Sequence, residues 1–131
     1  MRFAILTVAL FSMCLGVRAA KLPELDSNPY VKLTQVMKHG TLHVSVKNIS
    51  RKPVLAYVVA LDNGGQITTH RDYFTGRDVF APGKTVELVF AVPSASATPK
   101  VFVDYLKLAD KSTWGNAVTD DGKEVAAALA Q

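Results

Sequence analysis

The residues best suited to binding a partner form one short run, Tyr73-Phe74-Thr75-Gly76-Arg77, together with Trp114 farther along the chain. Aromatic side chains and arginine dominate the energetics of protein interfaces, and tyrosine and tryptophan also stack on sugar rings. We therefore expect a surface that binds a protein or a glycan, made of Tyr73, Phe74, Arg77 and Trp114. The alternative is structural, and it is the commoner role of such residues. The aromatic pair would then fix an edge strand to the core, and Trp114 would close one end of the fold.

Histidine and methionine residues raise the question of a metal site. Met37, His39 and His43 lie close together in the sequence, and thioether and imidazole ligands suit copper. A hairpin over this segment would direct Met37 toward the core and His43 out of the opposite face, so the two could not share an ion. His70 lies far along the chain, where a place on an edge strand is expected. We predict no metal site.

An acidic pair followed by glycine, Asp120-Asp121-Gly122, could wrap a calcium ion. The spacing does not fit, because the alternating acidic positions and the terminal glutamate of a calcium-binding loop are absent. Asp120 or Asp121 is expected instead to cap a helix over residues 123–130, since acidic side chains in the first turn interact favourably with the helix dipole.

No catalytic constellation is recognisable in the sequence. Nucleophilic catalysis requires an activated serine, cysteine or threonine beside a base, and no Gly-x-Ser-x-Gly motif occurs. The single cysteine, Cys14, lies in the N-terminal segment. We therefore expect a protein that is not an enzyme and that has neither catalytic residues nor a cofactor.

The N-terminal segment has the order of a secretory signal peptide. Arg2 precedes an apolar run over residues 3–17, and the small-residue end Arg18-Ala19-Ala20 follows. The run is shorter than the roughly 20 residues that a spanning helix needs, so no stable membrane anchor is expected after cleavage. Cleavage after Ala19 would remove Cys14, whose bulky preceding residue argues against lipid attachment. The protein is expected to be secreted or periplasmic.

The charge of the chain gives no indication of a nucleic-acid partner. The chain has 15 basic and 11 acidic residues, a formal net charge of +4, and Arg2 and Arg18 belong to the predicted signal peptide. Binding to nucleic acid or to a membrane surface requires basic residues concentrated on one face, and no such concentration is visible in the sequence. We expect a protein or glycan partner and no nucleic acid.

A β-hairpin is predicted over residues 30–48, with His39-Gly40 as its two-residue turn. In that register most apolar residues of both strands fall on one face, namely Leu33, Met37, Leu42, Val44 and Val46, while apolar Val36 and polar Gln35 are exceptions to the pattern. The opposite face receives the polar residues Lys32, Thr34, Lys38, Thr41, His43, Ser45 and Lys47. Two strands with matching faces indicate a sheet with one buried side.

Four further strands are predicted, over residues 54–61, 66–74, 85–92 and 101–108. Strand 66–74 is polar, which suits the edge of a sheet. Short strands separated by turn residues predict an all-β fold, a single antiparallel β-sandwich of six to seven strands over residues 30–119. The signal peptide over residues 1–19 and a linker over 20–29 would precede it, and a C-terminal helical segment over 120–131 would follow.

The corner Asn48-Ile49-Ser50-Arg51-Lys52-Pro53 joins the hairpin to the next strand. Asparagine and serine side chains bond nearby backbone groups in bends, and proline is tolerated at the first position of a strand. The Asn-x-Ser pattern also matches a glycosylation acceptor, and the two cations could bind a ligand. A turn accounts for all of these residues, so we expect the corner to be structural.

Two motifs, VKNISRKPV and the later FAPGKTVELVF, resemble the recurring corner and Pro-Gly turn of small secreted bacterial immunoglobulin-like β-sandwich proteins. The segment VFVDYLKLADKSTWG is similar to one near the end of some proteins of this kind. The resemblance covers residues 30–108 and implies an immunoglobulin-like fold, although the disulfide and the buried tryptophan of antibody domains are missing. It implies no activity, since unrelated functions share this architecture.

One outer face of the predicted sandwich is too apolar to remain uncovered. Strict alternation directs inward Leu55, Tyr57, Val59, Leu61, Val101, Val103 and Tyr105. It leaves on the outside Val54, Ala56, Val58, Phe102, Leu106 and Leu108. Large apolar patches are rare on monomers, so we expect the C-terminal helix to cover this one through Val125 and Leu129. Asp104 would then be buried and would need a hydrogen-bond donor or a cation.

The expected function is therefore non-catalytic binding by an exported sandwich domain. A secreted proteinase inhibitor is one alternative, since small sandwiches can present a loop such as residues 75–82 to a protease. A carbohydrate-binding module is another alternative. It would need Trp114, Tyr73 or Phe74 to be coplanar and exposed on one surface.

Export predicts a defined N-terminus. We expect the exported protein to begin at Ala20, because the small residues Val17 and Ala19 lie where signal cleavage requires them. Intact-mass analysis of protein recovered after export measures this directly. A retained N-terminal segment, or a lipid mass on Cys14, would contradict the prediction.

Overall fold

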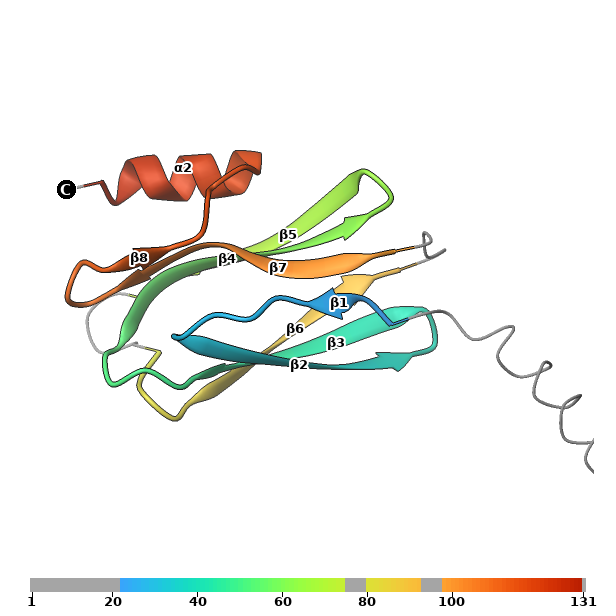
Figure 1. Cartoon of the computed structure of the whole chain (residues 1–131), viewed down its shortest axis with the longest axis horizontal. Helices are drawn as coiled ribbons and strands as arrows, with labels where there is room; N and C mark the ends of the chain where they lie inside the picture. Colours follow the sequence, from blue (N-terminus) through green and yellow to red (C-terminus); the bar gives the residue numbers. More distant parts are fainter. Residues whose placement is uncertain (1–21, 75–79, 93–97, 131) are drawn as a thin grey trace, which may run out of the picture.

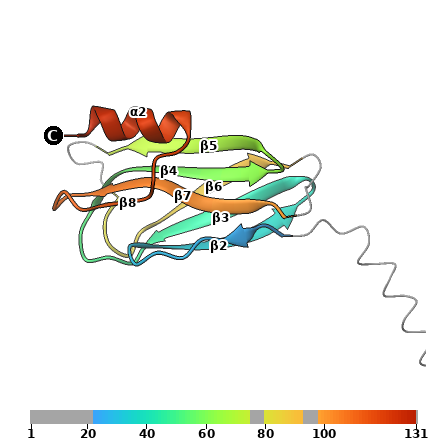
Figure 2. The same ribbon diagram turned by 45° about the horizontal axis from the view of Figure 1, so that its top comes forward.

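The computed structural model describes residues 22–74, 80–92 and 98–130. Two β-sheets pack face to face, and one helix lies on the outside of the larger sheet (Figure 1 and Figure 2). The elements in chain order are β1 (Glu24–Leu25), β2 (Val31–Lys38), β3 (Thr41–Asn48), β4 (Val54–Asn63), β5 (Gln66–Tyr73), β6 (Thr85–Ala91), β7 (Lys100–Leu108), β8 (Thr113–Trp114) and α2 (Asp120–Ala128). The predicted signal peptide lies outside the described residues. In the described part of the chain, no helix is long and apolar enough to cross a bilayer.

The strand order confirms an all-β sandwich. The larger sheet has the order β1-β7-β4-β5, with β8 also paired to β7, and the smaller sheet has the order β2-β3-β6. The polar strand β5 lies at a sheet edge, as predicted. Two features were not predicted: β1 lies within the segment expected to be a linker, and it pairs with β7 in parallel while the other strand pairs are antiparallel.

The first hairpin has the predicted register. Met37 lies opposite Leu42, and Leu33 lies opposite Val46. His39 adopts a φ of 47° in the turn, which the first position of a type I′ turn requires and which histidine tolerates better than most residues. The local pattern of alternation and turn was therefore sufficient to predict the strand pairing of this hairpin.

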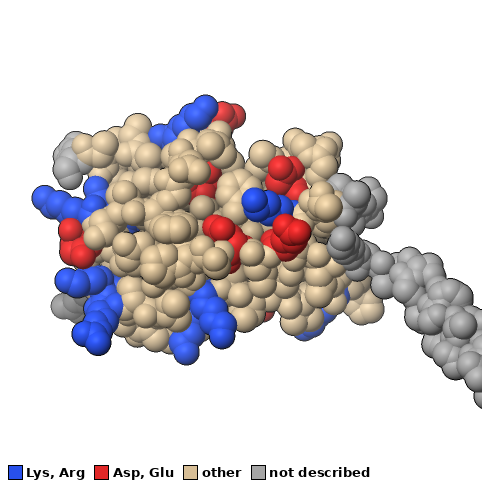
Figure 3. Space-filling view, viewed as in Figure 1, with Lys and Arg blue, Asp and Glu red and all other residues tan. Residues whose placement is uncertain are grey.

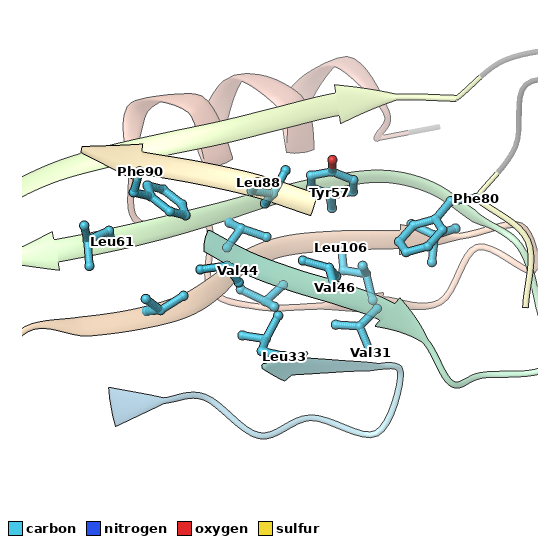
Figure 4. Close-up of a cluster of buried hydrophobic side chains, with 14 of the residues drawn as sticks. Val31, Leu33, Val44, Val46, Tyr57, Leu61, Phe80, Leu88, Phe90 and Leu106 are labelled. Carbon is cyan, nitrogen blue, oxygen red and sulfur yellow. The ribbon is translucent and has the colours of Figure 1, made fainter. Parts of the chain in front are cut away.

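The main core lies between the two sheets, where apolar side chains from both inner faces meet (Figure 4). The smaller sheet contributes Val31, Leu33, Leu42, Val44, Val46, Leu88 and Phe90. The larger sheet contributes Val54, Tyr57, Val59, Leu61, Val101, Val103, Leu106 and Leu108. Most of these side chains come from alternate strand positions, as expected for strands with one face toward the core.

A β-bulge in β7 corrects the predicted orientation of half of that strand. Val58 and Val59 of β4 pair with Tyr105 and Val103 of β7. Asp104 therefore has no opposing residue in β4 and forms the bulge. An extra residue reverses the in-and-out alternation beyond it. As a result Tyr105 points outward, whereas Leu106 and Leu108 point into the core, and the prediction for these three residues was wrong.

A second bulge lies in β4. Val54 pairs with Leu108, and Ala56 pairs with Lys107, so Leu55 is the extra residue. Val54 is buried in the core while Leu55 is only half-buried, which is the reverse of the prediction. From Ala56 onward β4 follows the predicted alternation, because no further residue is inserted into this strand.

Asn48 organises the corner between β3 and β4, and its side chain is fully buried. Its Nδ2 donates to the carbonyl oxygens of Lys52 and Phe80, both at 2.9 Å. Its Oδ1 accepts from the N–H and the hydroxyl of Ser50, at 2.9 and 2.7 Å. The corner is thus the structural turn that was predicted. Nδ2 is the atom to which a glycan would be attached, so the folded chain does not present Asn48 for glycosylation.

Helix α2 covers the outer face of β4 and β7, as predicted from its apolar positions. Val125 is fully buried against Ala56, Val58 and Tyr105, and Leu129 packs at the margin of this second core. Burial of one valine side chain contributes roughly 1.5–3 kcal/mol. So short a helix is marginal alone, and docking on the sheet holds it in place.

The N-cap of α2 is Thr119, and the prediction of Asp120 or Asp121 was wrong. The Thr119 hydroxyl accepts the N–H of Gly122 at 2.9 Å. The Asp104 carboxylate holds Thr119 in this position, because it accepts the threonine N–H at 2.9 Å and its hydroxyl at 2.6 Å. The two aspartates remain in the first turn, where the helix dipole favours negative charge.

Polar contacts fix both ends of α2 to the sheet. Arg71 of β5 donates to Glu124 at 2.7 Å and lies 3.2 Å from Asp121. The hydrogen bond and the charge of Glu124 raise the pKa of Arg71 above its ordinary value. Lys107, which the bulge in β7 turns outward, donates to the carbonyl oxygen of Leu129 at the helix C-terminus. A cation at this end interacts favourably with the dipole.

Asn48→Ala should destabilise the fold by about 2–3 kcal/mol, because two carbonyl groups lose their donor and the side chain is buried. Urea unfolding followed by circular dichroism measures the change in the free energy of unfolding. Gln66→Ala, at an exposed strand position, is the control and should change it by less than about 0.5 kcal/mol. Equal stability of the two variants would contradict the role assigned to Asn48.

Candidate functional site

The predicted aromatic surface is divided between two edges of the larger sheet. At the β5 edge, Phe74 packs against the core, with its ring centroid 5.8 Å from that of Tyr57 and 5.7 Å from that of Phe80. Tyr73 ends β5 and is 40% exposed. Arg77 lies outside the described residues, as does most of the loop expected for a proteinase inhibitor. The described part of this run thus supplies one packing residue and one exposed tyrosine.

The hydroxyl group of Tyr57, whose ring packs beside Phe74 and Phe80, is resistant to ionisation. Burial, and to a smaller extent the negative charge of Asp72, raises the pKa of the Tyr57 hydroxyl to about 12. The phenol therefore stays protonated at neutral pH. Tyr57 acts here as a packing residue rather than as an acid or a base.

Trp114 lies in β8, which pairs with β7 at the side of the sheet away from β5. Its ring meets Tyr30 edge-on, with the centroids 6.3 Å apart and the planes at 70°. It also packs against the main core, so the structural role expected for it is present. The indole is only half-buried, and Trp114 contributes to the wall of an open cleft.

This cleft, hereafter the β7 cleft, has a volume of about 630 Å³. Its lining combines aromatic rings with charged and amide groups. The lining includes Asp26, Asp62, Lys100, Phe102, Trp114 and Asn116. They come from four separate parts of the chain, so only the tertiary structure brings them together.

A gap in the strand pairing of β7 opens the cleft. β1 pairs with the beginning of β7, at Lys100 and Val101, and β8 pairs near its end, at Leu106 and Lys107. Among the described residues, no strand pairs with the edge of β7 between these two short strands, and the bulge at Asp104 falls within this interval. Side chains at the gap are therefore accessible from the side of the sandwich.

Asp26 forms hydrogen bonds with backbone groups at the open edge of β7, and its carboxylate also lines the cleft. Its backbone N–H donates to the carbonyl oxygen of Val101 at 3.1 Å, which continues the β1 pairing. Its Oδ2 accepts the N–H of Val103 at 3.3 Å. A carboxylate that replaces a missing strand in this way is held by the backbone and is pre-oriented toward the cleft.

Asp62 and Lys100 form a cross-strand pair of β4 and β7 at the other end of the cleft. The Asp62 Oδ1 accepts the N–H of Gly65 at 2.9 Å, which fixes the carboxylate through the adjacent hairpin turn. Figure 3 shows acidic and basic side chains close together in the region of β1 and β7, and the lining of the cleft includes three aspartates and one lysine. Carboxylates thus outnumber ammonium groups in the cleft.

Asp104 forms the inner wall of the cleft and confirms the prediction that it would find donors. In addition to Thr119, it accepts the N–H of Val118 at 2.8 Å. Its own carbonyl oxygen accepts the N–H of Ala117 at 2.8 Å. Charge-assisted hydrogen bonds of this kind compensate the burial of a carboxylate, so Asp104 serves structure rather than an exposed ligand.

Gly115 allows the chain after β8 to approach the bulge closely. Its φ is 101°, and a β-carbon added there would lie 2.4 Å from the carbonyl oxygen of Asp104. No L-amino acid with a side chain fits both constraints. This contact positions the neighbouring Trp114 and Asn116 on either side of the glycine at the mouth of the cleft.

The residues considered for copper lie in different places. Met37 packs against the core, and His43 lies on the outer face of the smaller sheet. His70 of β5 instead stacks edge-on against Phe90, with centroids 4.7 Å apart, and its Nε2 donates to the carbonyl oxygen of Val89 at 2.6 Å. Over residues 22–74, 80–92 and 98–130, no group of three histidine, cysteine, aspartate or glutamate residues could hold a metal ion.

No protein-family model matches the chain, and no curated protein matches it. The geometry of the site therefore carries the functional argument.

Sequence reasoning singled out Trp114 for binding, and Phe102 and Asp104 for other roles, but it did not identify Asp26, Asp62, Lys100 or Asn116 as members of a site. Asp62 and Lys100 could have been identified only after β4 and β7 were paired in the correct register. The position of Asp26 beside β7 could not be predicted, because β1 is two residues long and has no alternating pattern that would reveal it as a strand. Local pattern cannot reveal a site that is built at a gap between two such short strands.

Gly115→Ala should destabilise the protein by at least about 3 kcal/mol, since it combines a positive φ with a collision against backbone. Gly65→Ala is the matched control. Its φ is 94° but the space around it is open, so a loss of about 1 kcal/mol is expected. Chemical unfolding monitored by Trp114 fluorescence measures both. Similar losses in the two variants would show that the close approach at Asp104 does not constrain the cleft.

Proposed function

We propose that the chain is an exported, non-catalytic binding module of immunoglobulin-like topology whose β7 cleft receives a lysine or arginine side chain of a partner protein. The observation that carries this proposal is the convergence of Trp114 with the carboxylates of Asp26 and Asp62 at one open cleft. A cation beside an aromatic ring and two carboxylates gains cation–π attraction and charge-assisted hydrogen bonds together.

Fixed acceptors support binding rather than catalysis. Backbone N–H groups hold the carboxylates of Asp26 and Asp62, and the Asp104 carboxylate behind them already accepts three hydrogen bonds. Side chains that are already ordered lose little conformational entropy when a ligand arrives. Such groups are suited to recognition of a shape and a charge.

The charges of the cleft favour a single cation. Asp26 and Asp62 supply two negative charges, and Lys100 supplies one positive charge at the same cleft. One incoming lysine or arginine would reduce the excess negative charge of the cleft, to which Asp104 also contributes, whereas a carboxylate would be repelled by the aspartates. Phe102 adds apolar surface for the methylene stem of a long cationic side chain.

The strand order supports the immunoglobulin-like topology. The chain passes from one sheet to the other after β1, after β3, after β5 and after β6. In immunoglobulin-type sandwiches, strands A, B and E face a sheet that contains C, F and G, and variants add C′ beside C. The order β2-β3-β6 matches the first set, and β8-β7-β4-β5 matches the order G-F-C-C′.

Export is supported by the sequence alone, through the charged, apolar and small-residue order of residues 1–20. An exported domain without a catalytic group would meet its partner in the periplasm or outside the cell. The immunoglobulin-like resemblance of the corner and the Pro-Gly turn is consistent with such a role, although architecture does not define a ligand.

The proposal predicts selective binding of basic peptides. In a titration followed by ¹⁵N NMR, short peptides with one lysine or arginine should shift the amide signals of residues 113–118, and the same peptides with glutamine should not. Asp26→Asn combined with Asp62→Asn removes both charges but keeps an acceptor for Val103 and Gly65. We expect this double variant to bind roughly tenfold more weakly.

A matched variant controls for the loss of two negative charges. Asp72→Asn combined with Glu87→Gln changes exposed residues outside the cleft and should leave the affinity within about twofold. Soluble neutral oligosaccharides form a second arm of the titration. Shifts at residues 113–118 with oligosaccharides alone, or peptide binding that is indifferent to the two aspartates, would refute the assignment.

A further inference from the structure

The outer face of the smaller sheet gathers basic residues that the sequence scatters over two strands. This basic sheet face consists of the outward residues of β2, β3 and β6, and it contains Lys32, Lys38 and Lys47. Among the outward residues of these strands, Glu87 is the single acid. Figure 3 shows basic side chains projecting along the lower margin of the molecule, where the smaller sheet lies.

Glu87, opposite Ser45 in the row next to Lys47, offsets only part of the positive charge of this face, and within the described residues none of its lysines forms an ion pair. Lys32 lies directly opposite Lys47 in the β2–β3 pairing, an arrangement that destabilises a sheet unless a counter-charge is present. The ion pairs of the described chain involve Lys52 and Arg71 and leave these lysines unpaired. An external anion would relieve the repulsion at this position.

Hydroxyl groups surround the two opposed lysines. Thr34 pairs with Ser45 in the next row, and Thr85 lies beside Lys47 on β6. With Ile49 these residues line a shallow cavity of about 360 Å³. Ammonium and hydroxyl donors around a shallow cavity are suited to phosphate oxygens.

Exposed aliphatic side chains lie on the same face. Val36 and Val89 flank His43 in one row across the three strands, and they are 53% and 45% exposed. Ile49, at the end of the face that carries Lys32 and Lys47, is 49% exposed. A soluble polyanion would make no favourable contact with these exposed aliphatic side chains, whereas a lipid surface would remove them from water.

We infer that the basic sheet face docks on a membrane surface rich in anionic phospholipid. The lysines would contact the headgroup phosphates, and the two valines would enter the apolar side of the headgroup region. This goes beyond the proposed function, because the face belongs to the smaller sheet while the β7 cleft opens along the larger one. A docked molecule would keep the cleft accessible to a partner.

The composition of the face disfavours a nucleic acid as its occupant. Single-stranded nucleic acids bind where aromatic side chains stack on bases, and arginine is preferred for bidentate contacts to phosphate. The outward residues of β2, β3 and β6 include neither an aromatic ring of phenylalanine, tyrosine or tryptophan nor an arginine. Lysine and valine on a flat sheet correspond better to an interfacial contact.

Sedimentation with vesicles tests the inference. The exported form of the chain should bind vesicles of 40% phosphatidylglycerol in phosphatidylcholine at 0.1 M salt, and binding should fall sharply at 0.5 M salt. Lys32→Gln combined with Lys47→Gln should weaken binding roughly 25-fold, since each basic residue near an anionic surface contributes about fivefold. Lys111→Gln combined with Lys123→Gln, which changes exposed lysines elsewhere, should have less than a twofold effect.

The valines distinguish a lipid surface from a soluble polyanion. Val36→Ser combined with Val89→Ser should weaken vesicle binding roughly fivefold without changing the net charge. All variants share one N-terminus, so residues 1–21 do not affect the comparison. Equal binding to pure phosphatidylcholine, or no binding to either vesicle, would overturn the inference. Binding to dextran sulfate with vesicle binding indifferent to the valines would overturn it in favour of a soluble polyanion.

Discussion

The hydrogen bonds accepted by the Asp104 carboxylate hold together β7, the loop before α2 and the start of α2. Asp104 lies at the bulge of β7, and its carboxylate accepts hydrogen bonds from Val118 and from both donors of Thr119. Thr119 in turn caps the helix, and a side chain at Gly122 would collide with the same carboxylate. Because hydrogen bonds to a charged group contribute roughly 1.5–3 kcal/mol each, one residue joins a strand, a loop and a helix.

The bulge at Asp104 also decides which residues meet the helix and which meet the core. It turns Tyr105 toward Val125 and Lys107 toward the C-terminal carbonyl of Leu129, and it returns Leu106 to the space between the sheets. The apolar outer face is therefore narrower than strict alternation predicts. Its centre is covered by α2, and the part of β7 that precedes the bulge remains open as one wall of the cleft.

The two surfaces proposed for binding differ in charge and in the sheet that builds them. The β7 cleft carries more carboxylates than cations and is formed where strand pairing is interrupted, whereas the basic sheet face carries lysines on continuous strands. Rigid strands and backbone-held carboxylates position both sets of side chains. Under the two proposals, a partner at the edge of the larger sheet and a surface on the outer face of the smaller sheet would be bound at separate places.

The sequence by itself determined the features that depend on local pattern. Alternation and a two-residue turn defined the first hairpin and hence the outward lysines, the polar side chains predicted the corner at Asn48, and spacing predicted that Val125 and Leu129 would face the sheet. Only the tertiary structure decided the two bulges, the parallel β1, the Thr119 cap and the cleft. A bulge inserts one residue without altering composition, and the contacts that stabilise it, such as Asp104 with Thr119, join positions 15 residues apart. Pattern within one strand cannot encode such contacts.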